Sequence, residues 1–191
     1  MGFSPGWSRA GVKAEAPLTL LREYATALRQ LLDGERVTTS GRYVIIQDIA
    51  LEYPPLKPPP LLIGVAGAKS LAAAGELGTG TLLALGLDLD AIKEASQTTL
   101  KSAGSDHEVI ASVLVATGPD ARARVDAELA EYGMKGTPEI GAVGNAEEIA
   151  HRLLQVAAAG ATSISVMPTR DEPDFDAFAH FLGQEVRPLL A

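Results

Sequence analysis

The residues best suited to chemistry lie where a short apolar run meets the start of a helix. Residues 61–65 predict a buried strand, and helix-forming residues follow from Lys69 onward. Free N–H groups and the helix dipole favour an anion at such a junction. A phosphate-binding loop would consist of Gly64, Val65, Ala66, Gly67, Lys69 and Ser70. The two glycines would permit close backbone approach, and Lys69 and Ser70 would donate to phosphate oxygens. The other interpretation is that the glycines only shape the turn.

Other kinds of reactive site find little support. The sequence has no cysteine, which excludes disulfides and thiolate metal sites. Its three histidines, His107, His151 and His180, are far apart and lack the spacing of metal ligands, so we interpret them as packing or surface residues. The net charge of −8, without a basic stripe, argues against a nucleic-acid partner. We therefore expect no metal and no nucleic acid.

The expected location is the cytoplasm. No apolar run approaches the ~20 residues that a membrane-spanning helix needs. The first residues lack the charged and apolar regions of a signal peptide. A hydrophobic content of 47% is ample for a packed core, so we expect a folded protein with no membrane partner.

The first sixty residues predict a helix, a hairpin and a connector. Leucines recur at helical spacing from Pro17 to a stop at Gly34. Residues 36–39 and 43–46 predict a β-hairpin around Ser40-Gly41. Residues 53–60 hold five prolines and predict a stiff, irregular connector. We treat residues 1–60 as one segment, attached to the βα domain that begins at residue 61.

From residue 61 onward strands and helices alternate. The predicted strands are residues 61–65, 81–85, 108–117 and 162–167, and the predicted helices are residues 69–77, 88–102, 120–132, 145–160 and 173–190. Short apolar strands separated by helices are typical of a parallel sheet. Both a doubly wound open sheet and a piece of a barrel have this order, and periodicity does not choose between them.

Local sequence favours the barrel. Residues 58–83 read PPPLLIGVAGAKSLAAAGELGTGTLL. They resemble the motif PPvyigA.GpKalrlAGelaDGvil of the luciferase-like, flavin- or deazaflavin-dependent oxidoreductases. Weaker similarities are PLTLLREY at residues 17–24, LLDGE at 31–35, GRY at 41–43 and residues 145–168. The sequence departs from the family at Ala68, which replaces proline, and at Thr79, which replaces aspartate. Loss of that aspartate is expected to weaken the turn before the next strand.

The resemblance implies an α/β fold, the C-terminal half of a (β/α)8 TIM barrel with about four βα units over residues 61–191. A complete barrel needs eight such units and ~250 residues. In the family, the loop at Gly64–Ser70 contacts the phosphate side of the coenzyme. The implied coenzyme is the deazaflavin F420, with FMN as the alternative. The first four strands of the family carry the catalytic residues, so none is assigned in this sequence.

Two further positions follow from the resemblance. Trp7 would lie in the loop that lines the mouth of the active site, or would anchor that loop by packing. Arg170 and Asp171 follow the last strand, at the end of a barrel where ligands bind, or are simply solvated.

Two functions remain open. The chain is either part of an oxidoreductase or monooxygenase that transfers hydride between F420 or FMN and an undetermined small organic substrate, or a non-catalytic half-barrel that self-associates. Unpaired edge strands and a bare apolar interior are unfavourable in water. We therefore expect a homodimer, an association with a missing N-terminal half, or residues 1–60 folded across the opening, and favour the homodimer.

Overall fold

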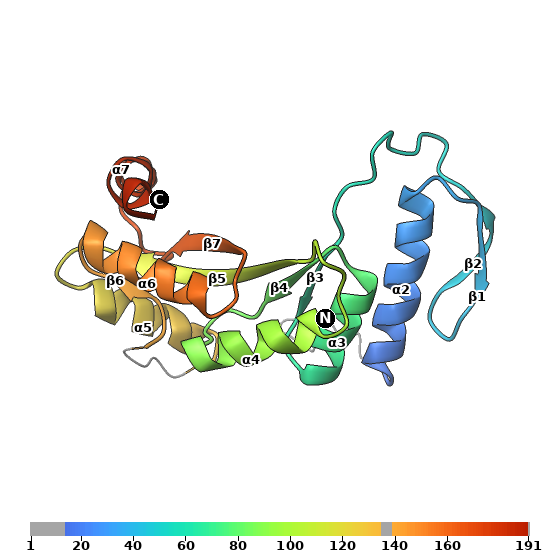
Figure 1. Cartoon of the computed structure of the whole chain (residues 1–191), viewed down its shortest axis with the longest axis horizontal. Helices are drawn as coiled ribbons and strands as arrows, with labels where there is room; N and C mark the ends of the chain where they lie inside the picture. Colours follow the sequence, from blue (N-terminus) through green and yellow to red (C-terminus); the bar gives the residue numbers. More distant parts are fainter. Residues whose placement is uncertain (1–13, 135–138, 191) are drawn as a thin grey trace. The chain divides into compact units, whose positions relative to one another are not determined.

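A computed structural model describes residues 14–134 and 139–190 (Figure 1). The helices are α2 (Pro17–Leu32), α3 (Ala68–Leu77), α4 (Leu89–Leu100), α5 (Ala121–Glu131), α6 (Ala146–Ala158) and α7 (Phe175–Phe181), followed by a π turn (Leu182–Val186) and a 3₁₀ turn (Arg187–Leu190). The strands are β1 (Val37–Ser40), β2 (Ile45–Ile49), β3 (Leu62–Val65), β4 (Gly80–Leu83), β5 (Glu108–Ala116), β6 (Ala142–Val143) and β7 (Ser163–Pro168). The chain divides into two compact units. The first is Met1–Leu82 with Thr98–Glu108, and the second is Leu83–Gln97 with Val109–Ala191.

Helix α2 packs against α3 in the first unit. It begins at Pro17, as predicted, because a proline at this position removes an N–H that has no acceptor within the helix. Leu21 and Ala25 are buried on its inner face. Arg22 forms an ion pair with Glu76 of α3, so a polar contact joins the two helices as well as apolar packing.

The hairpin forms, but its second strand begins at Ile45 and not at the predicted Tyr43. The carboxylate of Glu23 in α2 explains the difference. It accepts the backbone N–H groups of Arg42, Tyr43 and Val44 at 2.9, 2.8 and 3.0 Å. These amides therefore donate to a side chain of α2 and not to the neighbouring strand. The bond from the Tyr43 amide, followed by that from Arg42, lowers the pKa of Glu23.

Strand β3 lies beside β4 in the first unit. The turn between α3 and β4 is held by backbone bonds, although Thr79 replaces the family's aspartate. The Thr79 N–H donates to the carbonyl of Leu61 at 3.0 Å, and the Thr79 carbonyl accepts the N–H of Glu108, also at 3.0 Å. The expected weakness of this turn is therefore offset by bonds to the chain on either side.

A buried polar cluster joins three segments of the first unit. The hydroxyl of Thr81 lies 2.7 Å from the hydroxyl of Thr99 and 2.8 Å from Nε2 of His107. Both threonines are fully buried, and burial lowers the pKa of His107, which favours the neutral imidazole. His107 is therefore a packing residue, as the sequence indicated.

Strand β5 is the centre of the second unit. It runs parallel to β7, with Val113 opposite Val166, and parallel to β6, with Val115 opposite Ala142. The pairing of β5 with β7 agrees with the expected succession of strands. Strand β6 was not predicted, because two residues are too few to show a period.

The core of the second unit joins β5 to α5. Buried Leu114 and Ala116 of the strand pack with Val125 and Leu129 of the helix. Asn145 is the N-cap of helix α6, as predicted. Its side chain accepts the Glu148 N–H while the Glu148 carboxylate accepts the Asn145 N–H. This capping box fixes where α6 starts.

The last helix differs from its prediction as one continuous helix over residues 173–190. Regular α-helix ends at Phe181, and the chain continues as a π turn and then a 3₁₀ turn. Pro188 accounts for the change, because a proline lacks the N–H that would bond to Gln184 and its ring clashes with that carbonyl. Val186 in the π turn remains buried.

Two kinds of feature are absent from residues 14–134 and 139–190. No helix there combines the length and the apolar character that crossing a membrane requires. The same residues contain no group of three or more histidine, aspartate or glutamate side chains that could hold a metal ion.

Candidate functional site

The predicted phosphate loop is a continuous strand-to-helix junction in the first unit. Gly64 and Val65 end β3, and Gly67 is the N-cap of α3. Lys69 and Ser70 lie in the first turn of the helix. Ala66 through Lys69 are exposed. The structure thus brings all six predicted residues together.

The backbone of this loop does not require glycine. Neither Gly64 nor Gly67 has a positive φ, and the φ of Gly67 is −87°. A Cβ at Gly64 would meet no atom within 4 Å, and a Cβ at Gly67 would meet only Ser70 Oγ at 3.7 Å. At Gly78, by contrast, a Cβ would lie 2.9 Å from the Leu61 carbonyl oxygen. The space above Gly64 and Gly67 is therefore open.

In the first turn of α3, some hydrogen-bond donors already have an acceptor within the turn and others do not. The carbonyl of Gly67 accepts the amide of Ser70 at 2.9 Å, the amide of Leu71 at 2.8 Å and the hydroxyl of Ser70 at 2.8 Å. Ser70 therefore donates inward and stabilises the turn. The amides of Ala68 and Lys69 lie at the start of the helix, where no preceding turn offers a carbonyl acceptor. These two amides, the helix dipole and the exposed Lys69 ammonium make the junction electropositive.

The residues beyond β7 are engaged within the second unit. Arg170 pairs with Glu128, at 3.6 Å, and with Glu131 of α5. Asp171 pairs with Arg124 of α5 at 3.0 Å. These contacts attach the segment after β7 to α5, so Arg170 and Asp171 are more than a solvated pair. Trp7 lies outside the described residues.

Arg124 is the centre of this attachment, and no motif in the sequence pointed to it. Its guanidinium contacts Glu172 and the hydroxyl of Thr169, both at 2.9 Å, in addition to Asp171. The side chain of Glu172 is only 8% exposed. The hydrogen bond to Glu172 is the main cause of the raised pKa of Arg124. An arginine on a helix surface is normally solvated, so only its acidic partners, more than forty residues away, could reveal its role.

Comparison with known proteins decides the family. Residues 3–138 match the luciferase-like monooxygenase family along more than half of the chain. This chain belongs to that family. The resemblance at residues 58–83 is thereby confirmed, despite the replacements at Ala68 and Thr79.

Two curated relatives match shorter stretches of this family member. An F420-dependent hydroxymycolic acid dehydrogenase of Mycobacterium tuberculosis is 35% identical over 60 residues, 31% of this chain and 17% of the relative. A 5,10-methylenetetrahydromethanopterin reductase of Methanolobus tindarius is 31% identical over 87 residues, 44% of this chain and 26% of the relative. The matched stretches thus span well under a third of each relative's length.

A solved structure shows the fold. An F420-dependent secondary alcohol dehydrogenase, in complex with an F420-acetone adduct, aligns with a TM-score of 0.78 and 16% sequence identity. The alignment covers 95% of this chain and 64% of the dehydrogenase. The predicted fold class, the C-terminal part of a TIM barrel preceded by a helix and a hairpin, is confirmed.

Proposed function

We propose that this luciferase-like chain is part of an oxidoreductase that binds F420 and that its Gly64–Ser70 junction holds a phosphate of the coenzyme. The observation that carries the proposal is the pair of glycines at positions 64 and 67. Neither has a positive φ, and a side chain at either would meet only open space or an ordinary contact. Glycine is useful there if another molecule approaches the backbone.

The junction fits a phosphate group. The amides of Ala68 and Lys69 would donate to its oxygens, and the Lys69 ammonium would balance its charge. Gly64, Val65, Ala66 and Gly67 would form the surface on which it lies. Ser70 would hold the turn through its bonds to Gly67 and could accept a hydrogen bond from the ligand.

The bound coenzyme would exchange a hydride with a small organic substrate. The described residues of this chain supply the phosphate junction, and no catalytic residue is assigned to them. F420 is preferred because two of the compared proteins are F420-dependent by name. FMN is the alternative, and titration of the protein with each coenzyme, followed by fluorescence, separates the two.

Replacing Gly67 with valine is expected to weaken coenzyme binding at least about tenfold, or ~1.4 kcal/mol. The branched side chain would occupy the space where we place the phosphate. Because a Cβ there meets only Ser70 Oγ at 3.7 Å, the melting temperature should change little. Fluorescence titration with F420 measures the binding effect.

Gly104→Val is the matched control, since Gly104 lies in another loop of the same unit and a Cβ there meets no atom within 4 Å. This variant should bind F420 like the wild type. Equal affinity in the wild type and a folded Gly67→Val variant would remove the junction from the coenzyme site.

The second candidate function is self-association without catalysis, and an exposed apolar face favours it. Leu62 in β3 is 42% exposed and Leu82 in β4 is 37% exposed. Leu62 Cδ2 lies only 2.6 Å from where a Cβ of Gly80 would be, so Leu62, Gly80 and Leu82 share one face of the sheet. In this proposal the face packs against a second copy of the chain or against a polypeptide that supplies the rest of a barrel.

Light scattering at micromolar concentration tests the self-association. We expect the mass of a dimer for the wild type and of a monomer for Leu82→Lys, because a buried lysine without a partner is unfavourable. Leu154→Lys changes a leucine that is 46% exposed on α6 and serves as the control. A monomeric wild type would exclude a second copy as the partner. A different polypeptide, one that supplies the rest of a barrel, would then be the proposed partner.

A further inference from the structure

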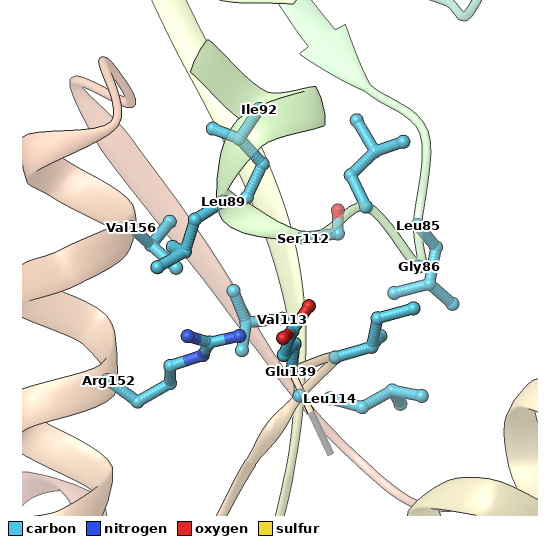
Figure 2. A pocket seen from close by; sticks show the side chains of 13 residues that line it. Leu85, Gly86, Leu89, Ile92, Ser112, Val113, Leu114, Glu139, Arg152 and Val156 are labelled. Carbon is cyan, nitrogen blue, oxygen red and sulfur yellow. The ribbon is translucent and has the colours of Figure 1, made fainter. Parts of the chain in front are cut away.

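A cleft in the second unit lies between the start of α4 and the middle of α6. We call it the α4–α6 cleft (Figure 2). Its inner part is narrow, about 10 Å³, and has a mixed lining. Leu89, Ile92 and Val156 are apolar members of this lining, and Ser112, Glu139 and Arg152 are polar ones. Its outer part is a hollow of about 340 Å³ edged by Asp88, Asp90 and Gln155. Leu89, Glu139 and Arg152 line both parts, so the two parts lie next to each other, and we treat them together.

The backbone around the cleft is fixed by conformation and packing. Gly86 and Gly141 both line it with positive φ values, 79° and 83°. A Cβ at Gly141 would lie 2.9 Å from Val125 Cγ1, so this segment sits directly on α5. Arg122 of α5 also donates to the carbonyl of Ile140 at 2.8 Å. The wall that carries Glu139 is therefore attached to the core.

Charges of both signs face the cleft. Figure 2 shows Arg152 reaching from α6 toward the middle of the cleft, where the carboxylate of Glu139 also lies. Within residues 14–134 and 139–190, the guanidinium of Arg152 has no ion pair within 4.0 Å, and it donates to the Gln155 side-chain oxygen at 3.1 Å. One oxygen of Asp88 already accepts the Ala91 N–H at 2.8 Å. Arg152 thus retains donors for a ligand.

We infer that the α4–α6 cleft binds a small zwitterion, with its carboxylate on Arg152 and its ammonium group on Glu139 and Asp90. A short apolar body would lie against Leu89. Arginine pairs with a carboxylate through two parallel hydrogen bonds, which gives such a site direction as well as strength. The hollow of about 340 Å³ lies within the usual range for small-molecule sites, roughly 300–1,000 Å³.

The charges disfavour other ligands. Three carboxylates, Asp88, Asp90 and Glu139, line the hollow together with one guanidinium, so a phosphate dianion would be repelled. A bare metal ion is equally unsuited, because these carboxylates do not converge into a metal-binding group in the described part of the chain. A molecule that carries both charges satisfies both sides of the cleft.

Three probes that share one isobutyl group test the inference. L-leucine carries both charges, 4-methylpentanoate only the carboxylate and 3-methylbutylamine only the ammonium group. Titration calorimetry of the full chain should show saturable binding of leucine with a dissociation constant of about 1 mM or lower. Each single-charge analogue should bind at least about tenfold more weakly, because one side of the cleft is left unpaired.

Two variants assign the binding to the cleft. Arg152→Gln and Glu139→Gln should each weaken leucine binding at least about tenfold, with melting temperatures close to that of the wild type. Arg29→Gln removes the same charge from α2 and should bind leucine normally. The inference is overturned if the wild type shows no saturable leucine binding at about 10 mM, if 4-methylpentanoate binds as well as leucine, or if both cleft variants bind it unchanged.

Discussion

Replacing Gly75 with alanine is expected to destabilise the first unit by about 3 kcal/mol. Gly75 lies in α3, where a Cβ would stand 2.2 Å from the carbonyl oxygen of Thr99 and 3.3 Å from the amide nitrogen of Ala103. Both obstacles are backbone atoms, so no side-chain rotation relieves the clash. Relief would require α3 to move away from the end of α4 and would disturb the buried contact between Thr81 and Thr99.

Thermal unfolding measures this effect, and a loss of 3 kcal/mol corresponds to a fall in melting temperature of about 10 °C for a chain of this size. Gly183→Ala is the control, because a Cβ at Gly183 meets no atom within 4 Å. That variant should melt at or slightly above the wild-type temperature, since alanine lowers the entropy of the unfolded chain. Equal melting temperatures for Gly75→Ala and the wild type would mean that α3 and α4 approach less closely than the structure shows.

Replacing Arg124 with leucine is expected to destabilise the second unit by about 2 kcal/mol. The Arg124 side chain is 17% exposed and its partner Glu172 only 8% exposed. The substitution would leave Glu172 largely buried without its cation, and the hydroxyl of Thr169 without this donor. The segment after β7 should then separate from α5. Urea unfolding and backbone hydrogen exchange of residues 169–172 measure the two consequences.

Arg170→Leu is the matched control. Arg170 also joins the segment after β7 to α5, but its side chain is 61% exposed. Solvent already screens its pair with Glu131, whose side chain is 59% exposed. The more buried Glu128 still accepts the Arg170 backbone N–H at 3.1 Å after the substitution, so the loss of the guanidinium should change stability little. If Arg170→Leu lowered the free energy of unfolding strongly and Arg124→Leu did not, burial of Glu172 would not determine the stability of this attachment.

Several elements of this protein could be predicted from the sequence because their causes are local. The leucines of α2 repeat at helical spacing, and Asn145 with Glu148 forms a capping box that four consecutive residues suffice to reveal. The Gly64–Ser70 junction is equally local, and residues 58–83 resemble the family that the comparison confirmed. Which glycines the backbone itself requires was not visible, because it depends on φ and on neighbouring atoms.

Long-range contacts decided the rest. The start of β2 depends on Glu23, about twenty residues earlier, whose carboxylate takes three backbone amides. The burial of Glu172 depends on Arg124, 48 residues before it.

The α4–α6 cleft likewise joins residues from separate parts of the chain, with Leu89 on α4 and Arg152 on α6. Each of these side chains is ordinary in its own segment. Their roles arise only when folding brings charged and apolar groups together, because distance and burial, not residue type, set the strength of their interactions.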